Sequence, residues 1–279
     1  MRVTILGSGA SSGTPSIGNN WGRCNPANPR NRRMRPAIVV ETEQTRILVD
    51  TPPDLRHQLL ATDIMRFDAV CYTHAHADHL HGIDDLRAIN RLTKAALPLY
   101  ATAHTVGEIR RRFGYTLEPH PVDAHWFSRP VLVPHEISAG EAFTIGDIRV
   151  EAFEQHHGRT MTLGFRFNDV AYSTDVAELP EASFAALAGV RLWILGVFSE
   201  RPFPTHCHLS QGLEWIARVQ PEAAVLTHLS SELDYDALVR RLPPHIAPAY
   251  DGMTIDVVDA VSGAPRDETI SAEPARRRA

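Results

Sequence analysis

The chain has 279 residues, of which 43% are hydrophobic and 22% charged. This balance is typical of an ordinary folded protein and excludes a disordered, fibrous or membrane-spanning chain. Lys and Arg number 28 against 33 Asp and Glu, a formal net charge of −5, which does not favour a dedicated nucleic-acid-binding protein.

Three further features bear on the compartment. No apolar run approaches the roughly 20 residues that cross a bilayer, and the opening residues 1–7 are too short and too β-branched for a signal peptide. The three cysteines are odd in number and far apart, which is typical of a reducing compartment. We therefore expect a cytoplasmic protein with no membrane partner.

Strand-like and helix-like patterns alternate along the chain. Four short runs of apolar, β-branched residues predict buried strands, and each run ends in an aspartate or a histidine: 46–50, 69–74, 170–175 and 223–228. Helical patterns occur at 53–61, 83–94, 108–113, 181–187, 210–218 and 235–241. Ser210 is the expected cap of the fifth helix. The alternation predicts an α/β sandwich, with the residues at the strand ends close together.

Two segments lack such patterns. Residues 115–134 are rich in proline and aromatic residues, and we expect an irregular insertion or lid there. Residues 263–279 are polar and aperiodic, which predicts a disordered tail after a single domain of residues 1–262.

A dense group of metal-binding residue types follows the second predicted strand, in the sequence Thr-His-Ala-His-Ala-Asp-His at 73–79. His74 and His76 are two apart on extended backbone and therefore face the same way. After the chain turns, Asp78 and His79 face a second point nearby. Imidazole and carboxylate together favour zinc, iron or manganese, so this segment predicts a metal centre.

One segment cannot supply every ligand of two metal ions, and the other strand ends offer the rest. The first predicted site consists of His74, His76 and one of His156 and His157. The second consists of Asp78, His79 and His228. Asp175 would bridge the two sites, because a shared carboxylate offsets the repulsion between cations roughly 3.5 to 4 Å apart.

This ordered ligand set resembles that of the metallo-β-lactamase superfamily, and the chain further resembles its PhnP-like phosphodiesterases. The stretches that carry the second resemblance are 6–15, 47–50, 82–87, 204–209 and 250–253. The resemblance implies a single-domain α/β fold, the four-layer αβ/βα sandwich, with the metal site at the edge between two sheets. It also implies two divalent ions per chain, zinc or manganese with iron as the alternative, and a homodimer.

The resemblance assigns roles residue by residue. His157 is the preferred ligand, because the family pattern places the ligand directly before a glycine. Asp50 would orient the histidine segment without binding metal. His206 would assist the leaving group, with His208 as the competing substrate contact. Asp78 and Asp175 would be catalytic as well as metal-binding, by positioning the attacking hydroxide.

The opening region departs from the family pattern. The better-known phosphodiesterase has a run of cysteines there that binds a structural zinc, whereas this chain has only Cys24, so we expect no such zinc. Four arginines follow within residues 30–35. They are interpreted either as phosphate-binding groups, with Arg35 as a substrate contact, or as a solvated loop.

The resemblance favours a metal-dependent phosphodiester hydrolase, in which a hydroxide bridging the two ions attacks a cyclic phosphate or another small phosphodiester. The predicted partner is thus a small phosphorylated substrate. A thioester or lactone hydrolase is the alternative, since the same hydroxide can attack a carbonyl carbon. An iron oxidoreductase is disfavoured because such members usually carry a glutamate in place of His76. A tRNA 3′-end processing nuclease is disfavoured by the net charge and by the lack of a tRNA-gripping insertion.

Overall fold

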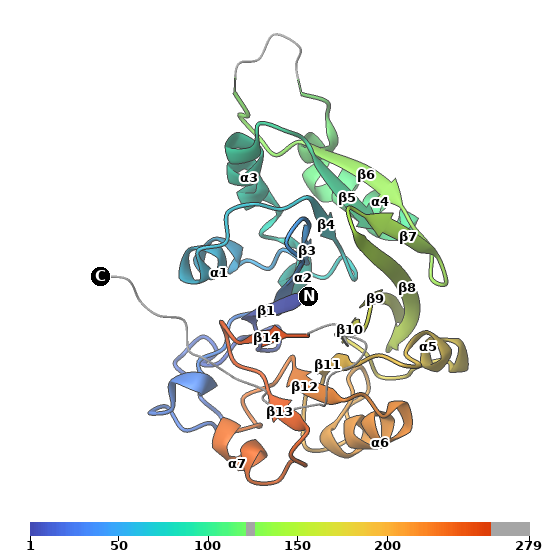
Figure 1. Cartoon of the computed structure of the whole chain (residues 1–279). Coiled ribbons are helices and arrows are strands. Elements are labelled where there is room, and N and C mark those ends of the chain that lie inside the picture. The colour runs from blue at the N-terminus through green and yellow to red at the C-terminus, as the bar shows by residue number, and fades with distance from the viewer. Residues whose placement is uncertain (121–125, 258–279) are drawn as a thin grey trace.

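The computed structural model describes residues 1–120 and 126–257. Two seven-stranded sheets lie face to face (Figure 1). The first sheet has the order β14-β1-β2-β3-β4-β5-β6, with strands at Thr254–Asp256, Arg2–Gly7, Ala37–Glu41, Arg46–Val49, Ala69–Cys71, Leu97–Ala101 and Leu132–Glu136. The second has the order β13-β12-β11-β10-β9-β8-β7, with strands at Ile246–Pro248, Ala223–Thr227, Leu192–Gly196, Val170–Ser173, Thr160–Phe167, Ile148–His157 and Ala142–Ile145.

Helices cover the outer face of each sheet (Figure 1). Helices α1 to α4, at Leu55–Thr62, Ala77–Leu80, Leu86–Thr93 and Ala103–Phe113, pack on the first sheet. Helices α5 to α7, at Glu181–Ala186, Leu209–Val219 and Tyr235–Val239, pack on the second. Three short 3₁₀ helices occur at Pro29–Asn31, Ile83–Asp85 and Gly114–Leu117. The predicted four-layer sandwich is therefore confirmed.

Side-chain alternation in the strands builds three apolar layers. In β3, Ile47 and Val49 join the core between the sheets, whereas Leu48 faces the outer helices. A sheet buried on both faces requires such continuous apolar strands, which explains why the strand patterns in the sequence are apolar throughout.

Strand direction places the polar strand ends at one edge. Strands β3 to β6 are parallel neighbours, and so are β10 to β13. All four predicted strands exist, but each ends one to three residues earlier than expected. Asp50, Asp175 and His228 follow β3, β10 and β12 in the left-handed region, with φ of 65°, 47° and 55°. The chain therefore turns at each of these residues, and their side chains lie at the edge of the sandwich.

Several expected element boundaries were wrong. Ser210 does not cap α6: the helix begins at Leu209 with His208 as N-cap, and the Ser210 hydroxyl bonds to His208 Nδ1 at 2.9 Å. Helix α4 begins five residues before the predicted start, because the Thr102 hydroxyl accepts the Thr105 N–H and caps it.

The expected insertion at 115–134 is correct only in part. Its last three residues belong to β6, which pairs in parallel with β5, and its first three to the 3₁₀ helix Gly114–Leu117. The predicted tail at 263–279 lies outside the described residues. Within the described part of the chain, no helix has both the length and the apolar character needed to cross a membrane.

Candidate metal centre

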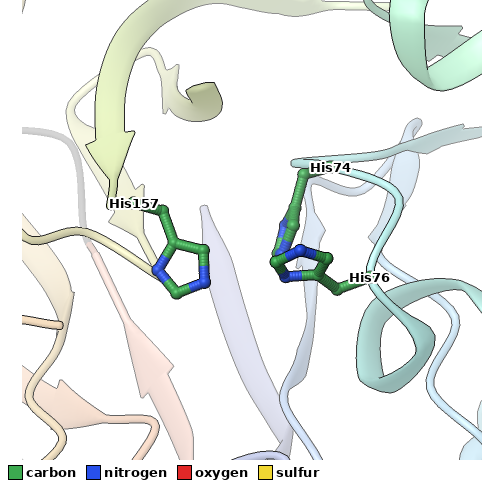
Figure 2. A group of neighbouring side chains, drawn as sticks. All are labelled: His74, His76 and His157. Atoms are coloured by element: carbon green, nitrogen blue, oxygen red, sulfur yellow. The ribbon is translucent and has the colours of Figure 1, made fainter. Parts of the chain in front are cut away.

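Three of the predicted ligands meet at the edge between the sheets (Figure 2). His157 ends β8, while His74 and His76 lie on the loop after β4 and face it from the other sheet. One ligand atom from each of the three lies within 4.8 Å of the others. The distances between ring centroids are 4.5 Å for His74 and His76 and 5.2 Å for His76 and His157.

The second predicted set meets beside the first. It comprises Asp78, His79, Asp175 and His228, whose ligand atoms also lie within 4.8 Å of one another. His228 Nε2 lies 3.2 Å from Asp175 Oδ1, and His79 Nε2 lies 3.5 Å from Asp78 Oδ2. The short helix α2 carries both Asp78 and His79, which explains why they face a point different from that of His74 and His76.

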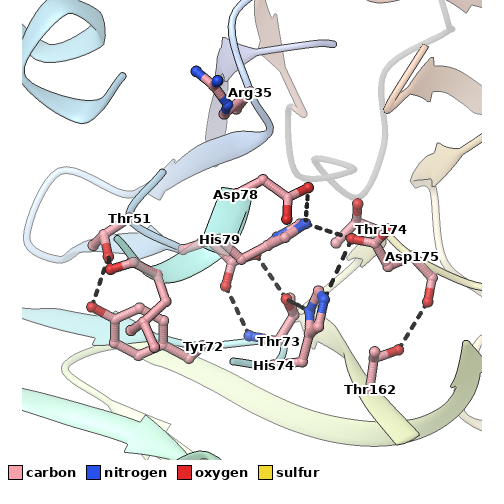
Figure 3. Close-up of polar contacts among 12 residues, drawn as sticks. Arg35, Thr51, Tyr72, Thr73, His74, Asp78, His79, Thr162, Thr174 and Asp175 are labelled. Atoms are coloured by element: carbon pink, nitrogen blue, oxygen red, sulfur yellow. Dashed lines mark hydrogen bonds and ion pairs between the residues drawn. The ribbon is translucent and has the colours of Figure 1, made fainter. Parts of the chain in front are cut away.

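Asp175 lies between the two clusters (Figure 3). Its Oδ2 contacts His79 Nε2 in the second cluster and lies 3.7 Å from His74 Nε2 in the first. Only 3% of its side chain is exposed. This is the position that a carboxylate shared by two cations requires.

The residues at this edge fit divalent cations. The Nε2 atoms of His74, His79 and His228 and the Oδ2 atom of Asp175 are buried and make no hydrogen bond of regular geometry, although His79 Nε2 and Asp175 Oδ2 contact each other. Buried polar atoms in folded proteins are otherwise almost always paired. Imidazole nitrogens together with carboxylate oxygens are the donor set that zinc, manganese and iron accept.

Hydrogen bonds at the opposite ring nitrogen orient three of the five predicted ligand histidines. Asp50 Oδ2 accepts from His79 Nδ1 at 2.7 Å and from the Thr73 hydroxyl at 2.8 Å. The Thr73 hydroxyl in turn lies 3.0 Å from His74 Nδ1, and the Thr205 carbonyl lies 2.5 Å from His157 Nδ1. With Nδ1 occupied, Nε2 of each ring is left free to bind metal.

Burial and neighbouring charges set the protonation states. Burial alone would raise the pKa of Asp175, but His228 and His79 hold it well below its usual range. Burial and the adjacent His79 lower the pKa of His74. Burial and the adjacent His228 lower the pKa of His206 to about 3. At neutral pH the Asp175 carboxylate is therefore ionised and the His74 ring is neutral, the forms that bind a cation. Despite its burial, the neighbouring carboxylates of Asp175 and Asp78 raise the pKa of His79 well above its usual range.

His206 joins this site. Its Nδ1 lies 3.1 Å from Asp175 Oδ1, and its ring stacks on those of Phe198 and His228, with centroid distances of 4.6 and 5.0 Å. His208 instead lies at the start of α6, bonded to Ser210.

His156 and Arg35 lie apart from the ligands. His156 bonds to Glu154 Oε1 at 2.7 Å, because neighbouring residues in a strand point to opposite faces. The Arg35 guanidinium bonds to Asp54 at 3.1 Å and to the Ser11 carbonyl, and Figure 3 shows it pointing away from the ligands.

Within the arginine run, Arg30 and Arg32 are exposed and lie over aromatic rings, as expected of a solvated loop, whereas Arg33 fits neither interpretation. Arg33 is 2% exposed and donates to the carbonyls of Ser230 at 3.1 Å and Leu233 at 2.7 Å. The planar guanidinium, with five donors, can bridge two carbonyls in this way. Arg32 lies over the Trp21 ring. Arg33 therefore joins two chain segments and is neither a phosphate contact nor a solvated residue.

Four residues near the centre were not identified as functional from the sequence: Thr73, Phe198, Thr205 and Arg112. Thr73 directly precedes the ligand His74 in the histidine motif, and this position could have indicated that it contacts the ligand. Thr205 acts through its main-chain carbonyl, which any residue type supplies. Nothing in the sequence marks Phe198 or Arg112.

A cavity of about 320 Å³ opens beside His74 and His76. Helix α4 forms one wall and the start of β9 the other, with His104, Glu108, Arg112, Thr160 and Met161 among the lining residues. A small molecule in this cavity would lie directly against the first cluster.

Comparisons with known proteins agree with this architecture. A family model described as the beta-lactamase superfamily domain matches residues 45–229. The crystal structure of a new diphosphatase from the PhnP family superposes with a TM-score of 0.83 and 32% identity, over 92% of this chain and 98% of that one. The chain therefore belongs to the metallo-β-lactamase superfamily of hydrolases, in its PhnP-like group. Zinc-bound PqqB from Methylobacterium extorquens shares the fold, with a TM-score of 0.71 and 20% identity, over 92% of this chain and all of that one.

Curated relatives have more varied names. An octanoyltransferase of Porphyromonas gingivalis is 32% identical over 256 residues, which is 91% of this chain but 51% of that protein. A ribonuclease Z of a Bradyrhizobium species is 29% identical over 147 residues, 50% of this chain and 46% of that protein. The chain thus spans about half the length of the curated relatives that it matches.

Proposed function

We propose that the chain is a dinuclear metal-dependent phosphodiester hydrolase acting on a cyclic phosphate or another small phosphodiester. The observation that carries the proposal is the position of Asp175, which lies between two clusters of possible ligand atoms and approaches both. The similarity to a PhnP-family diphosphatase over nearly the full length of both chains supports cleavage at phosphorus.

The ligand roles follow from the two clusters. His74, His76 and His157 would hold one ion, and a second set would hold the other, with Asp175 shared: Asp78, His79 and His228. When bound, two divalent ions, zinc or manganese, supply an activated water and offset charge on the phosphoryl oxygens.

Other side chains would position the substrate. Asp175 holds the His206 ring by its Nδ1, and Phe198 fixes the plane of that ring by stacking. His206 would then contact the departing oxygen. The cavity beside His74 and His76 is near the lower end of the volumes of small-molecule sites, about 300 to 1,000 Å³. A small phosphorylated substrate therefore suits it better than a nucleic acid, which the net charge of −5 also disfavours.

The proposal is tested by initial rates of the purified protein on four substrates: bis-p-nitrophenyl phosphate, a 1,2-cyclic ribose phosphate, a thioester and a lactone. We expect turnover of the phosphodiesters. His157→Ala should lower the rate by about 100-fold or more, because it removes a ligand. His156→Ala is the matched control, and should keep the rate because that side chain bonds to Glu154 on the other face of the strand.

Turnover of the thioester or lactone alone would contradict the proposal and assign an acyl hydrolase. Cleavage of a precursor tRNA at its 3′ end, without turnover of the small phosphodiesters, would assign a nuclease.

A further inference from the structure

Arg112 contacts the metal-binding segment, residues 74–81, at two separate points. One guanidinium nitrogen, NH2, donates to the Ala75 carbonyl at 2.6 Å. The other, NH1, lies 3.2 Å from His81 Nε2. We propose that Arg112 is a positioning residue that holds this segment in its metal-binding conformation.

The two contact points lie on either side of His76, Asp78 and His79 in the chain. Ala75 lies between His74 and His76, so a bond that holds its carbonyl also restrains the backbone that carries both rings. His81 is the C-cap residue of α2, the helix that carries the ligands of the second cluster. One side chain therefore fixes the start and the end of the segment that supplies four of the seven predicted ligands.

The segment needs such an anchor. Helix α2 has only four residues, which is far too short to be stable by itself. Helix α4, which carries Arg112, is the firmer element: Thr102 caps it, and Val106 and Ile109 are fully buried against the first sheet. Arg112 thus ties the short helix α2 and the loop before it to the well-packed helix α4.

The guanidinium is itself held in place. Its Nε lies 3.3 Å from Glu108 Oε2 one turn earlier on α4, and the side chain is 23% exposed. A planar fork can donate in two directions at once, whereas an ammonium group is a single point donor on a flexible stem. Lysine at this position could therefore reach the Ala75 carbonyl or His81 but would not hold both.

Arg111 provides the matched control. It is the neighbouring residue on α4 and pairs with the same Glu108 at 2.7 Å, but its side chain is 68% exposed. Its hydrogen bonds go to Glu108 and reach no part of the metal-binding segment. Replacing either arginine therefore removes a positive charge and a partner of Glu108. Only replacing Arg112 also removes the contacts with the metal-binding segment.

The inference requires the metal centre but not a particular substrate, so metal affinity is the readout. Zinc affinity is measured by competition with a chromophoric chelator for the wild type, Arg112→Met, Arg112→Lys and Arg111→Met. We expect affinity about 10- to 100-fold weaker in Arg112→Met and about 10-fold weaker in Arg112→Lys. Arg111→Met should stay within about twofold of the wild type.

Chemical rescue separates positioning from a general loss of structure. Millimolar guanidinium added to Arg112→Ala should restore part of the lost affinity, since it can reoccupy the site, and should leave Arg111→Ala unchanged. Wild-type affinity in Arg112→Lys, or equal losses in the Arg112 and Arg111 variants, would overturn the proposal. Because no substrate enters this assay, these outcomes are independent of whether a phosphodiester is hydrolysed.

Discussion

Three of the ligand histidines, His74, His79 and His157, are oriented through the ring nitrogen that faces away from the centre. Asp50 reaches His79 directly and His74 through the Thr73 hydroxyl. One buried carboxylate therefore sets the tautomer of two rings, one in each cluster, although it lies in neither.

Asp50→Asn should weaken metal binding by about 10- to 100-fold. The amide N–H₂ would face His79 Nδ1–H, two donors in contact, so the ring would shift its proton to Nε2 and lose its metal-binding lone pair. Thr73→Val should cost less, because it breaks only the connection to His74. Zinc affinity measured by chelator competition tests both variants. Asp256→Asn, at an exposed ion pair, is the control, and equal affinity in Asp50→Asn and in this control would contradict the assignment.

The sequence predicted the ligands far better than the residues that orient them. The seven predicted ligands come together, since each lies in the histidine motif or at the end of an apolar strand. Strand alternation places His157 in the cluster and turns His156 toward Glu154. The Thr205 carbonyl could not have been predicted, because a main-chain contact 48 residues away leaves no trace in residue type.

At the scale of elements, the sequence predicted the four strands but not the residues at which they end. The predicted strands extended to Asp50, Asp175 and His228, whereas these residues have left-handed backbone conformations just beyond the strands. Such conformations cost roughly 1 to 3 kcal/mol each and persist only where surrounding structure enforces them. Local pattern contains no information on that enforcement. For Asp50 it includes contacts with residues 21 to 29 positions further along the chain, at Cys71, Thr73 and His79.

The segment around the arginine run is held by distant parts of the chain. Arg33 bonds to carbonyls about 200 residues away, and Asn31 donates to Asp234 Oδ2 at 2.7 Å. The three partners, Ser230, Leu233 and Asp234, follow His228, so these bonds connect the opening loop to the chain just after a predicted ligand. A dense basic run resembles a phosphate site in sequence, and only these contacts reveal its structural role.

Arg33→Met should destabilise the fold by about 3 kcal/mol, because it removes two charge-assisted hydrogen bonds, to the Ser230 and Leu233 carbonyls. Arg32→Met should change stability by less than about 1 kcal/mol, since Arg32 is exposed and loses only a stacking contact with Trp21. The free energy of unfolding in urea provides the measurement. Equal values for the two variants, or a loss of substrate affinity in Arg33→Met at unchanged stability, would favour a phosphate-binding role instead.

At the scale of the whole molecule, the layers could be predicted from the sequence, but the pairing of the edge strand β14 with β1 could not. Alternating apolar strands and helices predicted two covered sheets, and both are present. The first sheet, however, is completed by β14, which pairs with β1 from the other end of the described chain. Arg2 and Asp256 form an ion pair across that junction, and no local pattern could indicate a contact 254 residues apart.

The central claim is that one edge of this sandwich forms a single centre for two metal ions. The most direct test is the metal content of the purified, dialysed chain, measured by mass spectrometry for the wild type and Asp175→Ala. We predict about two divalent ions per wild-type chain and fewer than about one in the variant, because Asp175 contacts both clusters. One ion per wild-type chain, or unchanged content in Asp175→Ala, would contradict the account.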